Sequence, residues 1–200
     1  MKILITVNYE KSVGDLLDEA VKAMPEKEVI FDGENRITYR ELNKQVDELA
    51  AGLRKLGIKK GDRIGVSLPA WYEFIVIVFA LARVGAILVP LNTRYREDEA
   101  EHILKDSGAV AVFITKEYDN VNQLQKFLNI RERVASLQHI IAVRFGHDGL
   151  HTYGSLQKEG NLIGFTSEEI VTREDVYALV YTSGTTGKPK GTMLTHYNLV

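Results

Sequence analysis

The chain has 200 residues, a formal net charge of −2 from 27 acidic and 25 basic residues, and no cysteine. This nearly balanced charge gives no electrostatic case for nucleic acid or an anionic membrane surface, so we expect neither partner. The absence of cysteine excludes disulfides and thiolate metal sites and is compatible with the cytoplasmic location that we expect. The hydrophobic fraction of 45% is ordinary, and a chain of this length can bury a sizeable core.

The first segments of the chain predict a helix, a hairpin and a second helix. Apolar residues at helical spacing predict a helix over residues 13–24. Residues 28–39 are typical of a hairpin with the turn sequence DGEN. Thr38 and Glu41 have capping-box spacing, which predicts that a helix begins there and is ended by Gly57. The N-terminal sequence MKILITVNYEK is typical of a strand or leader and lacks a signal-peptide cleavage pattern.

The rest of the chain alternates between apolar strand candidates and helical patterns. The apolar run at 74–82, FIVIVFALA, is far shorter than the roughly 20 residues of a membrane span, so it predicts a buried helix. Residues 144–173 are polar and rich in glycine, which predicts an irregular connection with one short helix near 153–158. Further strands are predicted at 63–68, 86–89, 109–114, 139–143 and 176–181, and further helices at 97–107 and 121–128.

This alternation predicts an α/β fold with a mostly parallel sheet that helices cover on both faces. In such sheets, ligands bind outside the carboxyl ends of the strands. The last predicted strand, 176–181, leads directly into residues 182–191, TSGTTGKPKG, which contain no hydrophobic side chain. The strand therefore places a polar loop at the edge where ligands bind.

The chemistry of this loop favours phosphate binding. Its glycines permit positive φ and close backbone approach, and successive N–H groups in such a loop form an anion-binding nest. Lysines supply charges suited to phosphate, and Pro189 limits the conformations of the loop. The hydroxyl and lysine side chains belong to Thr182, Ser183, Thr185, Thr186, Lys188 and Lys190, and the glycines are Gly184, Gly187 and Gly191.

Other interpretations of the loop stand beside phosphate binding. Serine, threonine, glycine, proline and lysine are common in solvated turns, so a flexible turn is one alternative. A Walker loop requires four residues between its glycines, whereas Gly184 and Gly187 are separated by two and Pro189 follows Lys188. The dinucleotide-binding pattern G-x-G-x-x-G does not occur in the sequence. The residues therefore favour a phosphate cradle of another type.

Residues 181–196, YTSGTTGKPKGTMLTH, resemble the signature loop of the adenylate-forming superfamily, which includes acyl-CoA synthetases, firefly luciferase and the adenylation domains of peptide synthetases. RITYRELN at 36–43 and ALARVGAILVPLNTRY at 80–95 resemble two further motifs of that family, in the same order and spacing. VPLNTRY is more similar to acyl- and aryl-CoA ligases, including the long-chain fatty acid–CoA ligase type, than to amino-acid-activating domains. Thr192 stands where valine is more usual.

The resemblance implies an ATP-dependent acyl-CoA ligase. Such an enzyme activates a carboxylic acid, here expected to be a fatty acid, as acyl-AMP and then transfers the acyl group to CoA, with Mg²⁺ beside ATP. It implies that Lys190 is catalytic and neutralises charge on the leaving pyrophosphate, and that Lys188 is a further lysine of the ATP site. The residues that it implies for the β- and γ-phosphates are Thr182, Ser183, Gly184, Thr185, Thr186 and Gly187.

The resemblance also implies that residues 1–200 are the N-terminal part of an AMP-binding domain. The rest of that domain, with the ribose and metal ligands, and the small C-terminal domain would then lie outside this chain. We therefore expect this part alone to be inactive. A stand-alone, non-catalytic nucleotide-binding or assembly module is the alternative, and a homo-oligomer is left open because truncation exposes a sheet edge.

Several other polar and aromatic residues have structural explanations. A single histidine without a partner defines no mechanism, so we expect His196 to have a local packing role. His147 and His151 lie four residues apart, but the glycines around them argue against a helix, so we expect no metal site there. Thr38 and Glu41 are interpreted as capping residues. The aromatic residues that fit the predicted core helix are Trp71, Tyr72 and Phe74.

Overall fold

The computed structural model describes residues 11–33, 35–166, 170–182 and 189–200. Its helices are α1 (Val13–Ala23), α2 (Tyr39–Lys55), α3 (Tyr72–Val84), α4 (Glu97–Ser107), α5 (Gln123–Arg133), α6 (Tyr153–Ile163) and a short 3-10 helix at His196–Asn198. Its strands are β1 (Glu28–Phe31), β2 (Arg36–Thr38), β3 (Arg63–Ser67), β4 (Ile87–Pro90), β5 (Ala111–Ile114), β6 (Glu117–Tyr118), β7 (Val121–Asn122), β8 (His139–Ala142), β9 (His151–Thr152), β10 (Val176–Thr182) and β11 (Lys190–Thr195).

The centre of the molecule is a sheet with the strand order β11-β10-β4-β3-β5-β8-β9. Neighbouring strands from β10 to β9 run parallel, whereas β11 pairs with β10 in the antiparallel direction. The interior strand β5 is buried along its whole length, which is typical of a parallel sheet covered on both faces. The prediction of a mostly parallel sheet is confirmed.

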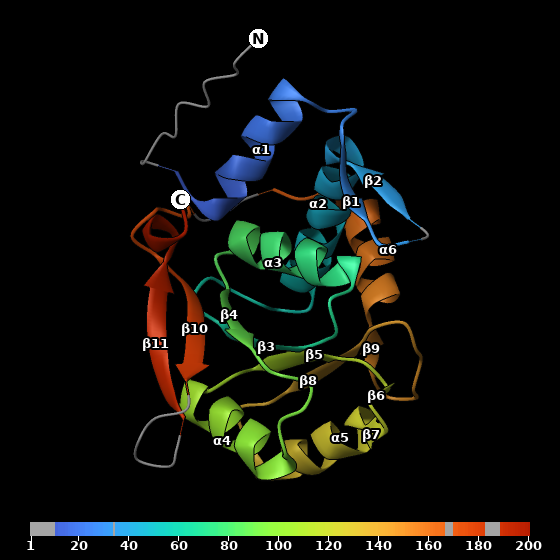
Figure 1. Cartoon of the computed structure of the whole chain (residues 1–200), viewed down its shortest axis with the longest axis vertical. Helices are drawn as coiled ribbons and strands as arrows, with labels where there is room; N and C mark the ends of the chain where they lie inside the picture. Colours follow the sequence, from blue (N-terminus) through green and yellow to red (C-terminus); the bar gives the residue numbers. More distant parts are fainter. Residues whose placement is uncertain (1–10, 34, 167–169, 183–188) are drawn as a thin grey trace.

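Helices cover both faces of this sheet (Figure 1). On one face, the buried residues of α1, α2, α3 and α6 form one hydrophobic cluster with the inner side chains of the sheet. On the other face, α4 and α5 form a second cluster with the opposite side chains of the same strands. This two-layered covering confirms the predicted α/β architecture.

The helix boundaries follow from local capping. α2 begins at a capping box, in which the Glu41 N–H donates to Thr38 Oγ1 at 3.2 Å and the Thr38 N–H donates to Glu41 Oε2 at 2.8 Å. α3 ends at Gly85, whose φ of 76° lies in the left-handed region that favours glycine. Within the described residues, none of the helices has the length and apolar character needed to cross a membrane.

The segment between β5 and α5 differs from the prediction. A hairpin of β6 and β7 occupies residues where the helix was expected to begin. Its turn residues Asp119 and Asn120 have φ values of 53° and 62°, the left-handed conformation of a tight hairpin turn. α5 therefore begins only at Gln123, capped by Asn122, and runs on to Arg133.

Two later elements, α6 and β11, also exceed what the sequence predicted. α6 runs from Tyr153 to Ile163, longer than the short helix expected near 153–158, and β9 precedes it. β11 pairs with β10, although its sequence KGTMLT lacks the apolar run by which the other strands were recognised. A neighbouring strand that supplies hydrogen bonds thus overrides the weak local signal of these residues.

The crossing of α2 and α6 explains why glycines occur inside a helix. A Cβ at Gly160 would lie 1.8 Å from the carbonyl oxygen of Glu48, and one at Gly52 would lie 2.2 Å from the carbonyl oxygen of Leu156. The two helix backbones therefore touch directly, and no side chain fits between them. Gly160, which was interpreted as a residue of an irregular connection, is required by this packing.

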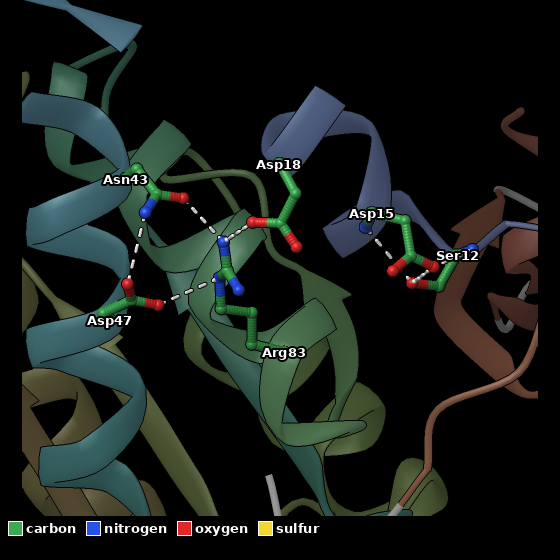
Figure 2. A network of polar contacts seen from close by, with 6 residues as sticks. All are labelled: Ser12, Asp15, Asp18, Asn43, Asp47 and Arg83. Atoms are coloured by element: carbon green, nitrogen blue, oxygen red, sulfur yellow. Dashed lines mark hydrogen bonds and ion pairs between the residues drawn. The ribbon is translucent and has the colours of Figure 1, made fainter. Parts of the chain in front are cut away.

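A network of polar contacts joins α1, α2 and α3 (Figure 2). Arg83 on α3 donates to Asp18 on α1 at 2.5 Å and to Asn43 on α2 at 2.6 Å. Its Nε lies 3.2 Å from Asp47 Oδ1, an ion pair without hydrogen-bond geometry. Burial raises the pKa of Asp47, and the Arg83 charge opposes that shift. One arginine thus links three of the helices that cover this face of the sheet.

Candidate phosphate-binding site

The end of β10 places the predicted loop at the carboxyl edge of the sheet. β10 ends at Thr182 and runs parallel to β4, so both strands end at the same edge. Lys190 begins β11 on the other side of the loop. The remaining predicted phosphate-binding residues lie outside the described residues, and they are Ser183, Gly184, Thr185, Thr186, Gly187 and Lys188.

Thr182 and Lys190 are brought together at the mouth of this loop. They are direct partners in the antiparallel register of β10 and β11, and both are exposed. Paired residues in an antiparallel ladder point to the same face, so the hydroxyl and the ammonium project to the same side. A donor and a positive charge on one side of a strand end are suited to an anion such as phosphate.

Helix α4 contacts both strand ends. It lies on the face of the sheet opposite to the side on which Thr182 and Lys190 project. The Tyr181 hydroxyl donates to Asp106 Oδ2 at 2.7 Å, and His102 Nε2 donates to the carbonyl oxygen of Pro189 at 3.2 Å. Burial, together with the hydrogen bond to Asp106, raises the pKa of Tyr181, so its hydroxyl remains a donor at neutral pH. A Cβ at Gly191 would lie 3.0 Å from the Tyr181 ring, so glycine leaves room for that ring.

The turn after β4 flanks the same edge. The parallel register pairs Ala178 with Leu88, which places this turn beside the end of β10. Gln123 Nε2 donates to Thr93 O at 2.8 Å, and Lys126 Nζ donates to the carbonyl oxygen of Tyr95 at 3.1 Å. Burial lowers the pKa of Lys126. These α5 side chains hold the backbone of the turn.

The residues on α4 and α5 that support this edge were not recognised from the sequence. Their partners are backbone carbonyls and a hydroxyl far along the chain, and such pairs leave no periodic pattern. The only sequence signal is the presence of polar residues on helix faces that otherwise bury apolar ones, which is a weak signal. The residues concerned are His102, Asp106, Gln123 and Lys126.

His196 lies at the other end of β11 from the candidate site. His196 lies six positions after Lys190, which corresponds to about 20 Å of strand at roughly 3.3 Å per residue. Its buried ring accepts a hydrogen bond at Nδ1 from the Val13 N–H at 3.1 Å and lies against the Tyr177 ring. Burial lowers the pKa of His196. These contacts agree with a local packing role, since they join the end of β11 to the first turn of α1.

The other singled-out residues lie in structural surroundings. His147 and His151 are exposed, and the His151 ring meets His139 edge-on, with 5.6 Å between the ring centroids. In the part of the chain that the structure describes, no group of three or more His, Cys, Asp or Glu residues is placed to hold a metal ion. The aromatic residues that pack against the core cluster are Trp71, Tyr72 and Phe74.

The fold is thus an α/β domain with a strand–loop–strand unit at the carboxyl edge of its sheet. A family model described as "AMP-binding enzyme" matches residues 17–200. The chain therefore belongs to the AMP-binding enzyme family, whose members form acyl-adenylates. This confirms the resemblance that the three sequence motifs carry.

Curated relatives include named acyl-CoA ligases. "Medium-chain acyl-CoA ligase ACSF2, mitochondrial" of Bos taurus is 33% identical over 215 residues, which cover 95% of this chain and 34% of that protein. "Acyl-CoA ligase sidI" of Aspergillus fumigatus is 36% identical over 177 residues, covering 82% of this chain and 30% of that protein. The chain spans about a third of the length of these curated relatives.

Solved structures of similar fold include ligases of different acids. An anthranilate CoA ligase, AuaEII, in complex with anthranoyl-AMP has a TM-score of 0.85 and 25% identity, covering 96% of this chain and 36% of that chain. A long-chain-fatty-acid-CoA ligase, FadD1, from Archaeoglobus fulgidus has a TM-score of 0.78 and 30% identity, covering 94% of this chain and 37% of that chain. The expected fold, that of the N-terminal domain of an adenylate-forming enzyme, is confirmed.

Proposed function

We propose that this chain provides the ATP-phosphate-binding part of an ATP-dependent acyl-CoA ligase. The observation that carries the proposal is the pairing of Thr182 with Lys190 at the carboxyl edge of the sheet, on either side of the signature loop. Membership of the AMP-binding enzyme family supports it. The enzyme would activate a carboxylic acid as acyl-AMP and then transfer the acyl group to the thiol of CoA.

The chemistry of the first step explains what this edge has to supply. A carboxylate oxygen attacks the α-phosphorus of ATP, and the bond to the leaving pyrophosphate breaks as negative charge accumulates on it. Catalysis then consists mainly of positioning and charge stabilisation. Lys190 supplies a positive charge for the pyrophosphate, and Thr182 supplies a hydroxyl. Mg²⁺ would enter with ATP and neutralise part of the same charge.

The signature loop completes this part of the proposal. Residues 183–187 would bind the β- and γ-phosphates through backbone N–H groups and hydroxyls, as nests of this composition do. Lys188 would contribute a second positive charge. The acid is proposed to be a fatty acid, because relatives are named medium-chain acyl-CoA ligase and long-chain-fatty-acid-CoA ligase. The name of the anthranilate CoA ligase makes an aromatic acid the first competitor in a substrate screen.

The test of this function is acid-dependent ATP–pyrophosphate exchange by the full-length gene product. We expect Lys190→Ala to lower the exchange rate by about 100-fold, because a charge that acts on the leaving group is lost. We expect a smaller change, less than about fivefold, in the KM for ATP. Lys22→Ala, at an exposed lysine of α1, is the matched control and should leave the rate unchanged. Equal exchange rates for wild type and Lys190→Ala would contradict the assignment.

A non-catalytic nucleotide-binding module is the second candidate. The chain spans about a third of the length of its curated relatives, so its own exchange activity is expected to be absent. The intact mass of the native protein in its source cells separates the candidates. A mass more than twice 22.5 kDa favours the ligase, and a mass of 22.5 kDa favours the module. Cell fractionation tests the proposed cytoplasmic location against a mitochondrial one, which the name of the bovine relative suggests.

Self-association of the chain is a further proposal. β11 lies at the edge of the sheet, and Met193 on that strand is 67% exposed. An exposed strand edge with apolar side chains favours pairing with another chain. Sedimentation at high concentration should therefore show an oligomer, and a monomer throughout the concentration range would contradict this.

A further inference from the structure

Helix α4 carries two polar side chains that face the strand ends of the candidate site. His102 and Asp106 lie four residues apart and therefore on the same side of the helix. His102 binds the carbonyl of Pro189, and Asp106 accepts from the hydroxyl of Tyr181. Each of these partners is the direct chain neighbour of a residue proposed to contact phosphate. One helix thus reaches both sides of the loop.

The helix that makes these contacts is itself firmly held. Ile103 and Leu104 are fully buried in the cluster on this face of the sheet. At the end of the helix, Arg63 Nε donates to the carbonyl of Ser107 and Arg63 Nη2 donates to that of Gly108, each at 2.8 Å. Carbonyls at a helix end require such partners. α4 is therefore a fixed support against which the exposed strand ends can be positioned.

The ends of β10 and β11 require such a support to keep their positions. β11 is an edge strand, and both Thr182 and Lys190 are exposed. Exposed strand ends open easily, because few buried contacts oppose the opening. From this geometry, and resting on the proposed function, we propose that His102 and Asp106 are positioning residues that hold Thr182 and Lys190 in place for the phosphates of ATP.

This role has a kinetic consequence that general destabilisation lacks. If Lys190 acts on charge that develops as pyrophosphate leaves, then a misplaced Lys190 lowers the rate of adenylation more than it weakens ATP binding. A small displacement of a reacting or stabilising group is sufficient for a large loss of rate. The loss should also vanish when Lys190 has already been removed, because His102 acts through it.

The first experiment measures ATP–pyrophosphate exchange by full-length variants. His102→Ala should lower kcat by about tenfold and change the KM for ATP by less than about threefold. His102→Gln keeps an N–H donor and should restore most of the rate. His102→Ala should cause no further loss in a Lys190→Ala background. Lys105→Ala, at a neighbouring exposed position of α4, is the control and should retain full activity.

Several outcomes of the kinetic experiment would overturn the proposal. These are an unchanged kcat in His102→Ala, failure of His102→Gln to restore it, or additive losses with Lys190→Ala. Tyr181→Phe tests the other contact with the same readout, because it removes the hydroxyl and keeps the ring. Its kcat should also fall, with the KM for ATP nearly unchanged.

A second experiment separates failure of this inference from failure of the proposed function. Absence of exchange in the wild type with every acid tested would overturn the proposed function. Amide hydrogen exchange of the 200-residue chain tests the positioning role independently of activity. The amides of Thr182 and Lys190 should lose about tenfold protection in His102→Ala and regain it in His102→Gln. Unchanged protection at these amides would overturn the positioning role, whatever the enzyme does.

Discussion

The crossing of α2 and α6 and the paired ends of β10 and β11 are held in opposite ways. At the crossing, two helix backbones touch at Gly52 and Gly160, and an added methyl group would collide with carbonyl oxygens. At the strand ends, Thr182 and Lys190 are exposed, and α4 reaches their chain neighbours through single hydrogen bonds. No room for an added side chain remains at the helix crossing, whereas Thr182 and Lys190 are open to solvent at the strand ends.

The two regions are therefore expected to contribute differently, the helix crossing to stability and the strand ends to function. Close backbone packing makes large energetic contributions but leaves no surface for a ligand. A strand end at a sheet edge makes small contributions, and its polar groups remain available to bind a phosphate. Substitutions in the helical layer should therefore change the free energy of unfolding, whereas substitutions at the strand ends should change activity first.

The largest expected effect is on the packed crossing. Gly160→Ala places a methyl group against the carbonyl of Glu48, and the helices have to move apart. We expect a loss of at least about 3 kcal/mol in the free energy of unfolding, or no folded protein. Gly154→Ala is the control on the same helix, because open space surrounds it, and it should be neutral or slightly stabilising. Urea denaturation compares them, and similar curves for the two variants would show that the crossing is not tight.

The next effect concerns the junction between β11 and the helical layer. His196→Ala removes the buried acceptor of the Val13 N–H, and we expect a loss of about 2 kcal/mol near pH 7. Because burial lowers the pKa of His196, the unfolded state binds more protons, so the histidine's contribution is present above the unfolded pKa and is lost as the pH falls. The difference between wild type and variant in denaturation should therefore shrink on acidification. A difference that grows would contradict this.

A smaller effect on stability is expected at the strand ends. Tyr181→Phe removes the hydrogen bond to Asp106 and retains the ring over Gly191, so we expect a loss of about 0.5–1 kcal/mol. Tyr118→Phe, at an exposed tyrosine of β6, should cause no loss. Chemical denaturation of both variants gives the comparison. A loss as large as that of Gly160→Ala would remove the distinction between the two regions.

The smallest effect is the acid dependence of the network around Arg83. Burial raises the pKa of Asp47 in the folded chain, so the folded state binds more protons and its contribution is present below the unfolded pKa. That contribution is lost as the pH rises through the folded pKa. Wild type should therefore lose stability relative to Asp47→Asn as the pH rises from about 3 to about 6. Asp148→Asn, in an exposed turn, serves as the control, and an opposite trend for Asp47→Asn would refute the sign.

The parts of the fold that could be predicted are those with strong local signals. Strands β3, β4, β5, β8 and β10 are rich in apolar residues, and α2 has both a capping box and an apolar face. β11 and the full length of α6 could not be predicted, because KGTMLT acquires its structure from β10, and Gly160 is favourable only where α2 lies against it. Such segments depend on partners distant in the sequence.

The candidate site divides in the same way. The composition and position of the loop predicted a phosphate site, and the structure places Thr182 and Lys190 at its two ends. The contacts of His102 and Asp106 could not be predicted, because they depend on which strand ends fold against α4. The sequence thus reveals the candidate loop, whereas only the structure reveals the side chains that contact its two ends.

The most direct measurement is a titration of the 200-residue chain with MgATP, followed residue by residue through backbone amide NMR signals. We expect saturable shifts at Thr182, Lys190 and Gly191, with the amides of Gly52 and Gly160 unchanged, because the proposed phosphate site lies at the strand ends and not at the helix crossing. Absence of a saturable shift at the strand ends, or shifts confined to the helical layer, would contradict the assignment of the phosphate site.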